Sequence, residues 1–165
     1  MISLSIKNTK QFMSHLLVQD TFDNFFLSEV QIKTANSFTI DGRINKSFYT
    51  REELENNNIE DFSRWTAIRP VCFNLVKGNK VPAFMKIVFM LPDDKIESLF
   101  NESSPSFSID DINGLYLNIR YSDGRLNVIT GISINTFTMD KSLEHALDKF
   151  IEAFMINIGI DFEIM

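Results

Sequence analysis

The chain has 165 residues, of which 44% are hydrophobic, enough for one ordinary core without a disulfide or a metal ion to stabilise it. Its net charge of −6 argues against broad nucleic-acid binding, because such binding depends on neutralising many phosphates. A single cysteine, Cys72, excludes an internal disulfide and favours a reducing, cytoplasmic environment.

Neither a membrane span nor a secretory signal is indicated. The longest apolar run, residues 87–91, is far shorter than the roughly 20 residues needed to cross a bilayer. The first ten residues, MISLSIKNTK, lack a basic region followed by an apolar core. We therefore expect a soluble cytoplasmic protein with no membrane association.

Strands and helices alternate in the first sixty residues. The hydrophobic patterns predict a strand at 2–6, a helix at 9–18, and strands at 25–34 and 38–40. Thr50 and Glu53 have the spacing of a capping box, with Tyr49 and Leu54 placed for a hydrophobic staple, so a short helix is expected to begin there. It ends in the polar run 56–58.

A third helix is expected at residues 62–77, where the apolar spacing is helical and Gly78 is suited to end it. Pro70 interrupts the pattern, because proline lacks a backbone N–H and disfavours helical geometry at Arg69. We therefore expect a first turn, a kink, and a helix that restarts at Pro70.

The hydrophobic patterns also predict the elements that follow residue 77. The almost continuously apolar run 83–91 predicts a strand covered on both faces. A helix is expected from Pro92 to Phe100, followed by a long loop to Asn113. The last helix is expected at 141–157 with Asp140 as its N-cap, and the tail as an edge strand. The side chains expected to be buried on this helix are Leu143, Ala146, Leu147, Phe150 and Phe154.

The strongest local signal is a hairpin at residues 115–134. Its two alternating segments are joined by Asp123-Gly124, a pair that tolerates the positive φ angles of a type I′ turn. A two-residue loop pairs Ser122 with Arg125, Tyr121 with Leu126, Ile119 with Val128, Leu117 with Thr130 and Leu115 with Ile132. Because a slip of one residue would turn the apolar set toward solvent, the pattern fixes this register.

Together these elements predict a single α+β domain over residues 1–165, with a mainly antiparallel sheet and helices packed on it. One internal echo is visible, because residues 36–41 (NSFTID) resemble residues 135–140 (NTFTMD). A strand-helix-strand-strand-helix pseudo-repeat, in the manner of a sliding-clamp domain, would explain the echo, and so would coincidence.

Recognisable catalytic motifs are missing from the sequence, which has no glycine-rich phosphate loop and no nucleophile elbow. Two histidines and one cysteine cannot supply the four ligands of a structural zinc site, so we expect no metal and no cofactor. His145 could shuttle protons, but a helical wheel places it beside Lys149 and Glu152 on a solvated face. Cys72 is expected to be a buried, inert thiol.

A carboxylate and arginine set offers one enzymatic alternative. Asp20 and Asp23 could hold a cation or act as an acid/base pair, with Arg43 or Arg69 completing an unfamiliar site. The competing interpretation is that both aspartates bond to the local backbone in the turn after the first helix.

The segment 62–92 is the only basic stretch. Residues 1–80 carry 10 basic and 9 acidic side chains, whereas residues 81–165 carry 6 and 13. Five residues of this segment would suit a phosphate or a stacked base, namely Arg64, Trp65, Arg69, Lys77 and Lys80. Alternatively, Trp65 anchors the core and the cations pair with the acidic second half.

Several segments resemble a family of small uncharacterised bacterial proteins known only as a domain of unknown function. They are TFDNF (21–25), SFTIDGRIN (37–45), SRWTAIRP (63–70), NGLYLNIRY (113–121) and TFTMDKSLEHA (136–146). The resemblance spans most of the chain and implies that the chain is complete. It implies no activity, substrate or site.

We therefore expect a non-enzymatic cytoplasmic binding or protein-interaction domain. A protein partner or a second copy of the chain, giving a homodimer, is favoured over nucleic acid. An enzyme with the carboxylate and arginine set, and phosphate or nucleic-acid binding through the basic segment, are the alternatives.

Overall fold

A computed structural model describes residues 1–78 and 80–165. Its centre is a seven-stranded sheet in which every pair of neighbouring strands is antiparallel, in the order β3-β2-β4-β5-β6-β1-β7. The strands are β1 (Ser3–Ile6), β2 (Phe26–Lys33), β3 (Ser37–Asp41), β4 (Phe84–Met90), β5 (Ile112–Ser122), β6 (Arg125–Ile134) and β7 (Phe162–Ile164).

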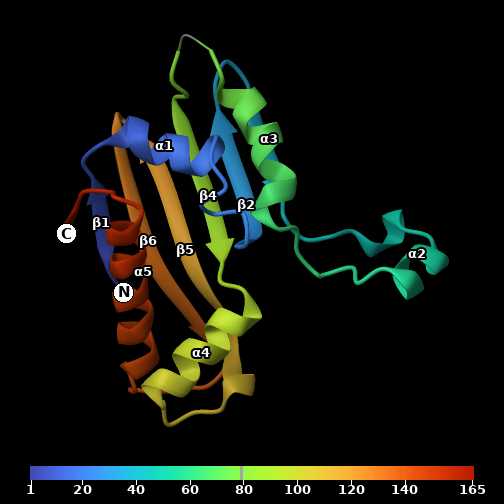
Figure 1. Ribbon diagram of the computed structural model, residues 1–165, viewed down its shortest axis with the longest axis vertical. Helices are drawn as coiled ribbons and strands as arrows, with labels where there is room; N and C mark the ends of the chain where they lie inside the picture. The colour runs from blue at the N-terminus through green and yellow to red at the C-terminus, as the bar shows by residue number, and fades with distance from the viewer. Residues whose placement is uncertain (79) are drawn as a thin grey trace.

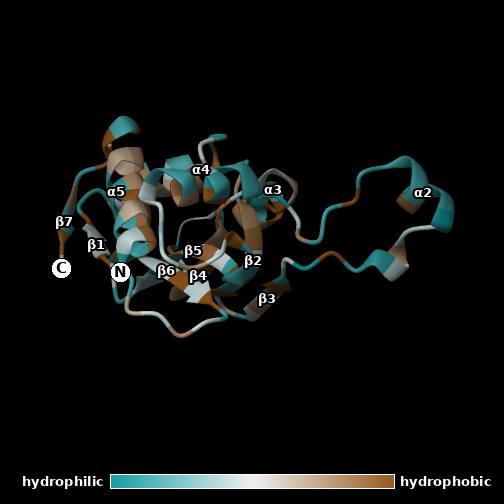
Figure 2. Cartoon of the chain, turned by 90° about the horizontal axis from the view of Figure 1, so that it is seen from below, coloured by the Kyte–Doolittle hydropathy of each residue, from teal (hydrophilic) through white to brown (hydrophobic). Residues whose placement is uncertain are grey.

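The helices that pack on the sheet all lie on one of its faces (Figure 1, Figure 2). They are α1 (Thr9–Leu17), α3 (Trp65–Val76), α4 (Asp93–Ser103) and α5 (Ser142–Asn157). A fifth helix, α2 (Arg51–Asn56), stands away from the sheet (Figure 1). Short 3₁₀ turns occupy Lys46–Phe48 and Ile109–Asp111. The fold is therefore α+β, as the sequence predicts.

The β5–β6 hairpin confirms the predicted register. Ser122 pairs with Arg125, Ile119 with Val128 and Leu115 with Ile132. Asp123 and Gly124 both have positive φ, at 53° and 74°, as a type I′ turn requires. The register points Leu117, Ile119 and Val128 toward the helices, where all three are fully buried.

Strand β4 is an interior strand of the sheet, between β2 and β5, but only one of its faces is fully covered. Met85, Ile87 and Phe89 are completely buried beneath the helices. On the opposite face Phe84 and Lys86 are partly exposed, so the expectation of a strand covered on both faces is wrong. The apolar run reflects a central position and not a second layer of helices.

Helix α3 runs from Trp65 to Val76 with Pro70 inside it, so the expected interruption does not occur. Pro70 removes one backbone hydrogen bond, the one that would reach the carbonyl of Thr66. Contacts on the N-terminal side of the proline outweigh this loss, because Trp65 is fully buried and Arg69 is bound by Asp23. Tertiary anchoring therefore overrides the local preference at Arg69.

Helix α5 begins one residue later than predicted, at Ser142, with Lys141 and not Asp140 in the capping position. Asp140 still serves the helix start, because its carboxylate accepts the backbone N–H of Ser142 at 2.9 Å. The buried face is turned slightly from the predicted one. It comprises Leu143, Leu147, Asp148, Ile151 and Met155, while Ala146, Phe150 and Phe154 are only partly buried.

The expected pseudo-repeat is not confirmed. Residues 37–41 form the edge strand β3, whereas residues 135–140 form an irregular connection between β6 and α5. The shared letters therefore adopt different backbone structures. The predicted edge strand at the C-terminal end is confirmed as β7, which pairs with β1.

Replacing Pro70 by alanine should stabilise the protein. Alanine restores the missing N–H in an exposed position of α3 and favours the helix more than proline does, so we expect a gain of about 1–3 kcal/mol in the free energy of unfolding. Urea unfolding followed by circular dichroism measures it. Pro105→Ala, in a loop, is the control and should show no comparable gain; an unchanged or less stable Pro70→Ala protein would contradict the account of α3.

Candidate functional site

Trp65 anchors the core. Its side chain is 0% exposed, and its indole N–H donates a hydrogen bond to the carbonyl of Leu16 at 2.8 Å. The ring also meets Phe89 edge to face, with centroids 5.1 Å apart. No face of the indole is open to solvent, so Trp65 is not placed to stack on a base or another flat ligand.

Arg64 holds neighbouring segments together. Its guanidinium donates to both carboxylate oxygens of Glu60 at 2.9 Å and to the carbonyl of Asn24 at 2.8 Å. It also lies 4.4 Å from the centre of the Phe26 ring. The hydrogen bonds to Glu60 are the main cause of the raised pKa of Arg64. The side chain is thus occupied within the protein.

Arg69 is likewise engaged by an aspartate. Its guanidinium makes two hydrogen bonds to the Asp23 carboxylate, at 2.8 and 3.1 Å, and a third to the carbonyl of Val18. The bond to Asp23 raises the pKa of Arg69. Both partners are largely shielded from solvent, and the pair ties α3 to the turn at residues 21–25. This geometry matches a fixed ion pair, in which both Asp23 oxygens are already occupied.

The carboxylate and arginine set is only partly brought together. Asp20 is exposed and close enough to Arg69 to favour its charged form. Arg43 instead lies beside Phe62, with its guanidinium 5.5 Å from the ring centre. Asp23 and Arg69 therefore form a pair, while Arg43 belongs to a different part of the surface.

Lys77 and Lys80 follow helix α3, and both are exposed. Lys80 lines a cavity of about 520 Å³ between α1, the end of α3 and the β5–β6 turn. The five residues proposed from the basic segment are therefore divided among the core, two ion pairs and a loop, and do not line one surface.

The remaining reactive side chains are separate from one another. His145 is exposed on α5 and lines a hollow of about 470 Å³ with Lys149 and Phe150. Cys72 is fully buried, and burial raises the pKa of its thiol to about 12, as expected for an inert cysteine. Within residues 1–78 and 80–165, no group of three or more histidine, cysteine or acidic side chains could hold a metal ion. None of the helices described there is long and apolar enough to cross a membrane.

The most unusual feature is an arm that extends from the body between β3 and α3 (Figure 1, Figure 2). We define the arm as residues 43–62. At its root, the backbone N–H of Ile44 donates to the carbonyl of Asp61, and Lys46 pairs with Asp61, both at 2.8 Å. Neither its 3₁₀ turn nor α2 has a buried residue. Phe48 is 81% exposed and packs only edge to face with Tyr49, among the aromatic pairs described.

A second unusual feature lies on the sheet face that the helices leave open (Figure 2). We define the basic patch as Lys33, Phe84, Lys86 and Arg120, from the adjacent strands β2, β4 and β5. Lys33 Nζ lies 5.3 Å and the Arg120 guanidinium 5.2 Å from the centre of the Phe84 ring. Lys86 pairs with Glu29 at 2.7 Å, whereas Lys33 and Arg120 make no ion pair with any described residue.

Comparison with known protein families gives a match over most of the chain. The family of unknown function DUF5721 matches residues 15–163. The chain belongs to this family. No curated protein and no solved structure matches it. Membership in DUF5721 confirms the resemblance seen in the sequence and brings no activity or site residues with it.

Two features of this DUF5721 protein were not predicted from its sequence, namely the exposed Phe48 of the arm and the basic patch. Phe48 carried a weak signal, because it and Tyr49 form a pair of large aromatic residues in an otherwise polar stretch. The sequence gives no sign of the basic patch, because its residues come from three separate segments of the chain that only strand pairing brings together.

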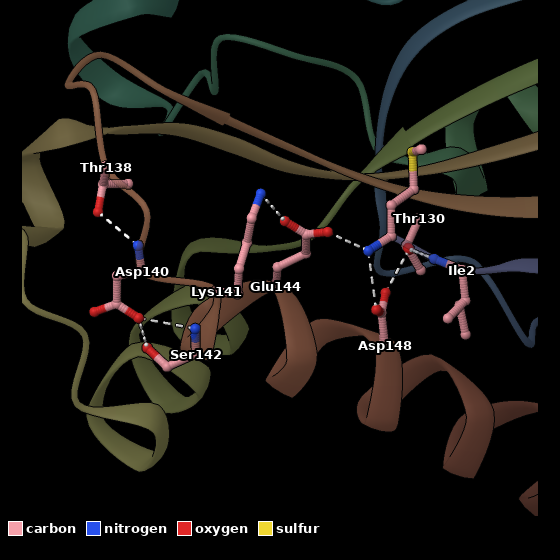
Figure 3. Close-up of polar contacts among 9 residues, drawn as sticks. Ile2, Thr130, Thr138, Asp140, Lys141, Ser142, Glu144 and Asp148 are labelled. Atoms are coloured by element: carbon pink, nitrogen blue, oxygen red, sulfur yellow. Dashed lines mark hydrogen bonds and ion pairs between the residues drawn. The ribbon is translucent and has the colours of Figure 1, made fainter.

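A polar cluster at the start of α5 has a structural role (Figure 3). Buried Asp148 accepts the Thr130 hydroxyl at 2.6 Å and the Met1 amino group at 3.0 Å, which joins α5 to β6 and β1. The Met1 amino group and Lys141 also contact Glu144, and the amino group is the main cause of the lowered pKa of Glu144. At the other end of the cluster, Asp140 accepts the Ser142 hydroxyl at 2.6 Å and the backbone N–H of Ser106 at 2.7 Å.

Asp140 should make stability depend on acid. The bonds from Ser142 and Ser106 hold the pKa of Asp140 well below its usual range, so its contribution is present above the unfolded pKa of about 4 and is lost as pH falls through the folded value. Urea unfolding of the wild type and Asp140→Asn, at pH 7, 5 and 3, should show a stability difference that shrinks toward pH 3. Ser142→Ala should reduce the difference in part. A difference that stays constant with pH would contradict this role.

Proposed function

We propose that this DUF5721 protein is a single α+β domain that acts in the cytoplasm as a non-enzymatic protein-interaction module, and that it pairs with a second copy of itself through the arm. The observation that carries the proposal is Phe48, which is 81% exposed on an arm whose 3₁₀ turn and α2 contain no buried residue. Large aromatic side chains in this position are typical of contact residues at interfaces.

The arm has little means of stabilising its own conformation. Helix α2 has six residues, which is too short to be stable alone in water, and its cap at Thr50 offsets only part of that deficit. Contacts at the root fix where the arm leaves the body but do not cover Phe48 or Tyr49. A partner that covers Phe48 and Tyr49 would bury the apolar surface that the arm cannot bury by itself.

The basic patch is complementary to the arm in charge and also carries an aromatic ring. The arm carries five acidic and three basic side chains, and Glu52 and Glu53 make no ion pair with any described residue. The basic patch presents Lys33 and Arg120 around Phe84, again without acidic partners among the described residues. Opposite charges together with aromatic rings on both surfaces support docking of one copy's arm on the open sheet face of another.

The alternatives have weaker support. For an enzyme using Asp20, Asp23, Arg43 or Arg69, the close bidentate bond between Asp23 and Arg69 leaves neither group available to a substrate. For phosphate or nucleic-acid binding through the basic segment, burial of Trp65 and the ion pairs of Arg64 and Arg69 remove three of the five proposed contacts. No specific observation favours either function over self-association.

Phe48→Ser should weaken the dimer. A two-fold symmetric dimer contains two copies of the arm, so the substitution removes two aromatic contacts, and the dissociation constant should rise by about 30-fold or more. Sedimentation equilibrium over a range of concentrations measures it. The matched control is Phe137→Ser, which removes another exposed aromatic outside the arm and should leave the dimer intact. A wild type that stays monomeric at high concentration, or a Phe48→Ser dimer of unchanged affinity, would refute the proposal.

A charge exchange tests which surface receives the arm. One variant, Glu52→Lys with Glu53→Lys, makes the arm basic, and a second, Lys33→Glu with Arg120→Glu, makes the patch acidic. Each variant alone should be monomeric, because its arm and patch repel. An equimolar mixture should form a heterodimer, because both arm-to-patch contacts then join opposite charges. If the mixture stays monomeric while the wild type dimerises, the arm docks somewhere other than the basic patch.

A further inference from the structure

We propose that the cavity between α1, the end of α3 and the β5–β6 turn binds a small amphiphile with an apolar body and a carboxylate head. The cavity has a volume of about 520 Å³, within the range of roughly 300–1,000 Å³ typical of small-molecule sites. It lies apart from the residues that define the arm and the basic patch, so this inference does not rest on the proposed function.

The inner part of the cavity is apolar. Met13 and Leu17 of α1, Met85 of β4 and Tyr121 of β5 all line it. Leu17, Met85 and Tyr121 are buried and form the floor of the cavity, whereas Met13 is only partly buried and Val81, at the rim, is 76% exposed. Methionine side chains adapt their shape to a bound hydrocarbon more readily than branched side chains do. An apolar body of moderate size suits these walls.

The charge of the lining is opposite to that of the protein. Lys10 and Lys80 both line the cavity, and no acidic side chain does so among the described residues. Neither lysine makes an ion pair with a described residue, although the chain as a whole carries a net charge of −6. Lys10 also lies in the first turn of α1, where the helix dipole is positive and no acidic residue offsets it. An anionic head group would supply the negative charge that no described residue offers to these lysines.

The apolar walls and the two lysines favour one chemical class of ligand over the others. A cationic amphiphile would meet two lysines, and a neutral one would leave both unpaired, so both are disfavoured relative to an anion of the same length. A nucleotide would need several polar groups to read its base and sugar, whereas the inner walls are apolar. A carboxylate on a single apolar chain or ring matches both the walls and the charge.

Sodium decanoate, below its micelle concentration, is the probe. Titration into isotopically labelled protein, followed by amide and methyl NMR spectra, should give saturable shifts at Met13, Met85 and Tyr121. Decanol and decyltrimethylammonium have the same chain without the negative charge, and each should bind about tenfold more weakly or worse, given two ion pairs at the cavity edge. Equal binding of decanol, or shifts that centre on the His145 hollow, would overturn the proposal.

Variants separate the head-group contacts from nonspecific effects. Lys10→Glu with Lys80→Glu should abolish the preference for decanoate over decanol, whereas Lys77→Glu, an exposed change just outside the lining, should keep it. Met13→Trp should fill the cavity and block all three probes. Unaltered decanoate affinity in the double lysine variant would overturn the proposal, whatever the Met13→Trp result.

The same titration distinguishes this site from the dimer contact. The Phe48→Ser protein should bind decanoate as the wild type does, so a failure of the dimer proposal leaves this test intact. If decanoate instead dissociates a wild-type dimer in proportion to its binding, the cavity holds part of a second copy, and the assignment to a small amphiphile is overturned.

Discussion

Pairing of β5 with β6 decides which side of the sheet is buried, and the rest of the molecule depends on that choice. The Asp123-Gly124 turn adopts two positive φ angles and sets a register in which Leu117, Ile119 and Val128 share one face. The four packing helices then cover that face alone (Figure 2). Because the other face stays open, Lys33, Phe84 and Arg120 remain accessible together, and the basic patch is a consequence of the same register.

Features of the fold that depend on residues close together in the chain were predictable from the sequence. The hairpin, the cap at Thr50 and the start of α4 after Pro92 each depend on residues close together in the chain, and the sequence indicates all three. Helix α3 was predicted with a break because the penalty of Pro70 is local, while the contacts that outweigh it are not. Trp65 bonds to Leu16 and Arg69 to Asp23, each more than forty residues away, and no helical pattern records such contacts.

Site prediction failed for a related reason. The basic segment looked like a site because its cations are close in sequence, but Arg64 and Arg69 each bond to a carboxylate and Trp65 lies in the core. The cations left without acidic partners among the described residues include Lys33 and Arg120, which come from different strands. Closeness in sequence therefore identified residues that hold the fold together, whereas pairing across strands assembled the basic patch on the open face of the sheet.

Helix α3 connects the two proposed sites. Its first residue follows directly on Arg64, which bonds to Glu60 of the arm, and its last residue, Val76, lines the cavity. Allosteric coupling between the sites would require this helix to move as a unit. Its first half is fixed, however, because Trp65 is bonded to α1 and Arg69 to the turn at residues 21–25. A ligand that enters the cavity and leaves the bonds of Trp65 and Arg69 intact would not shift the arm, so occupation of the cavity and association through the arm should be independent.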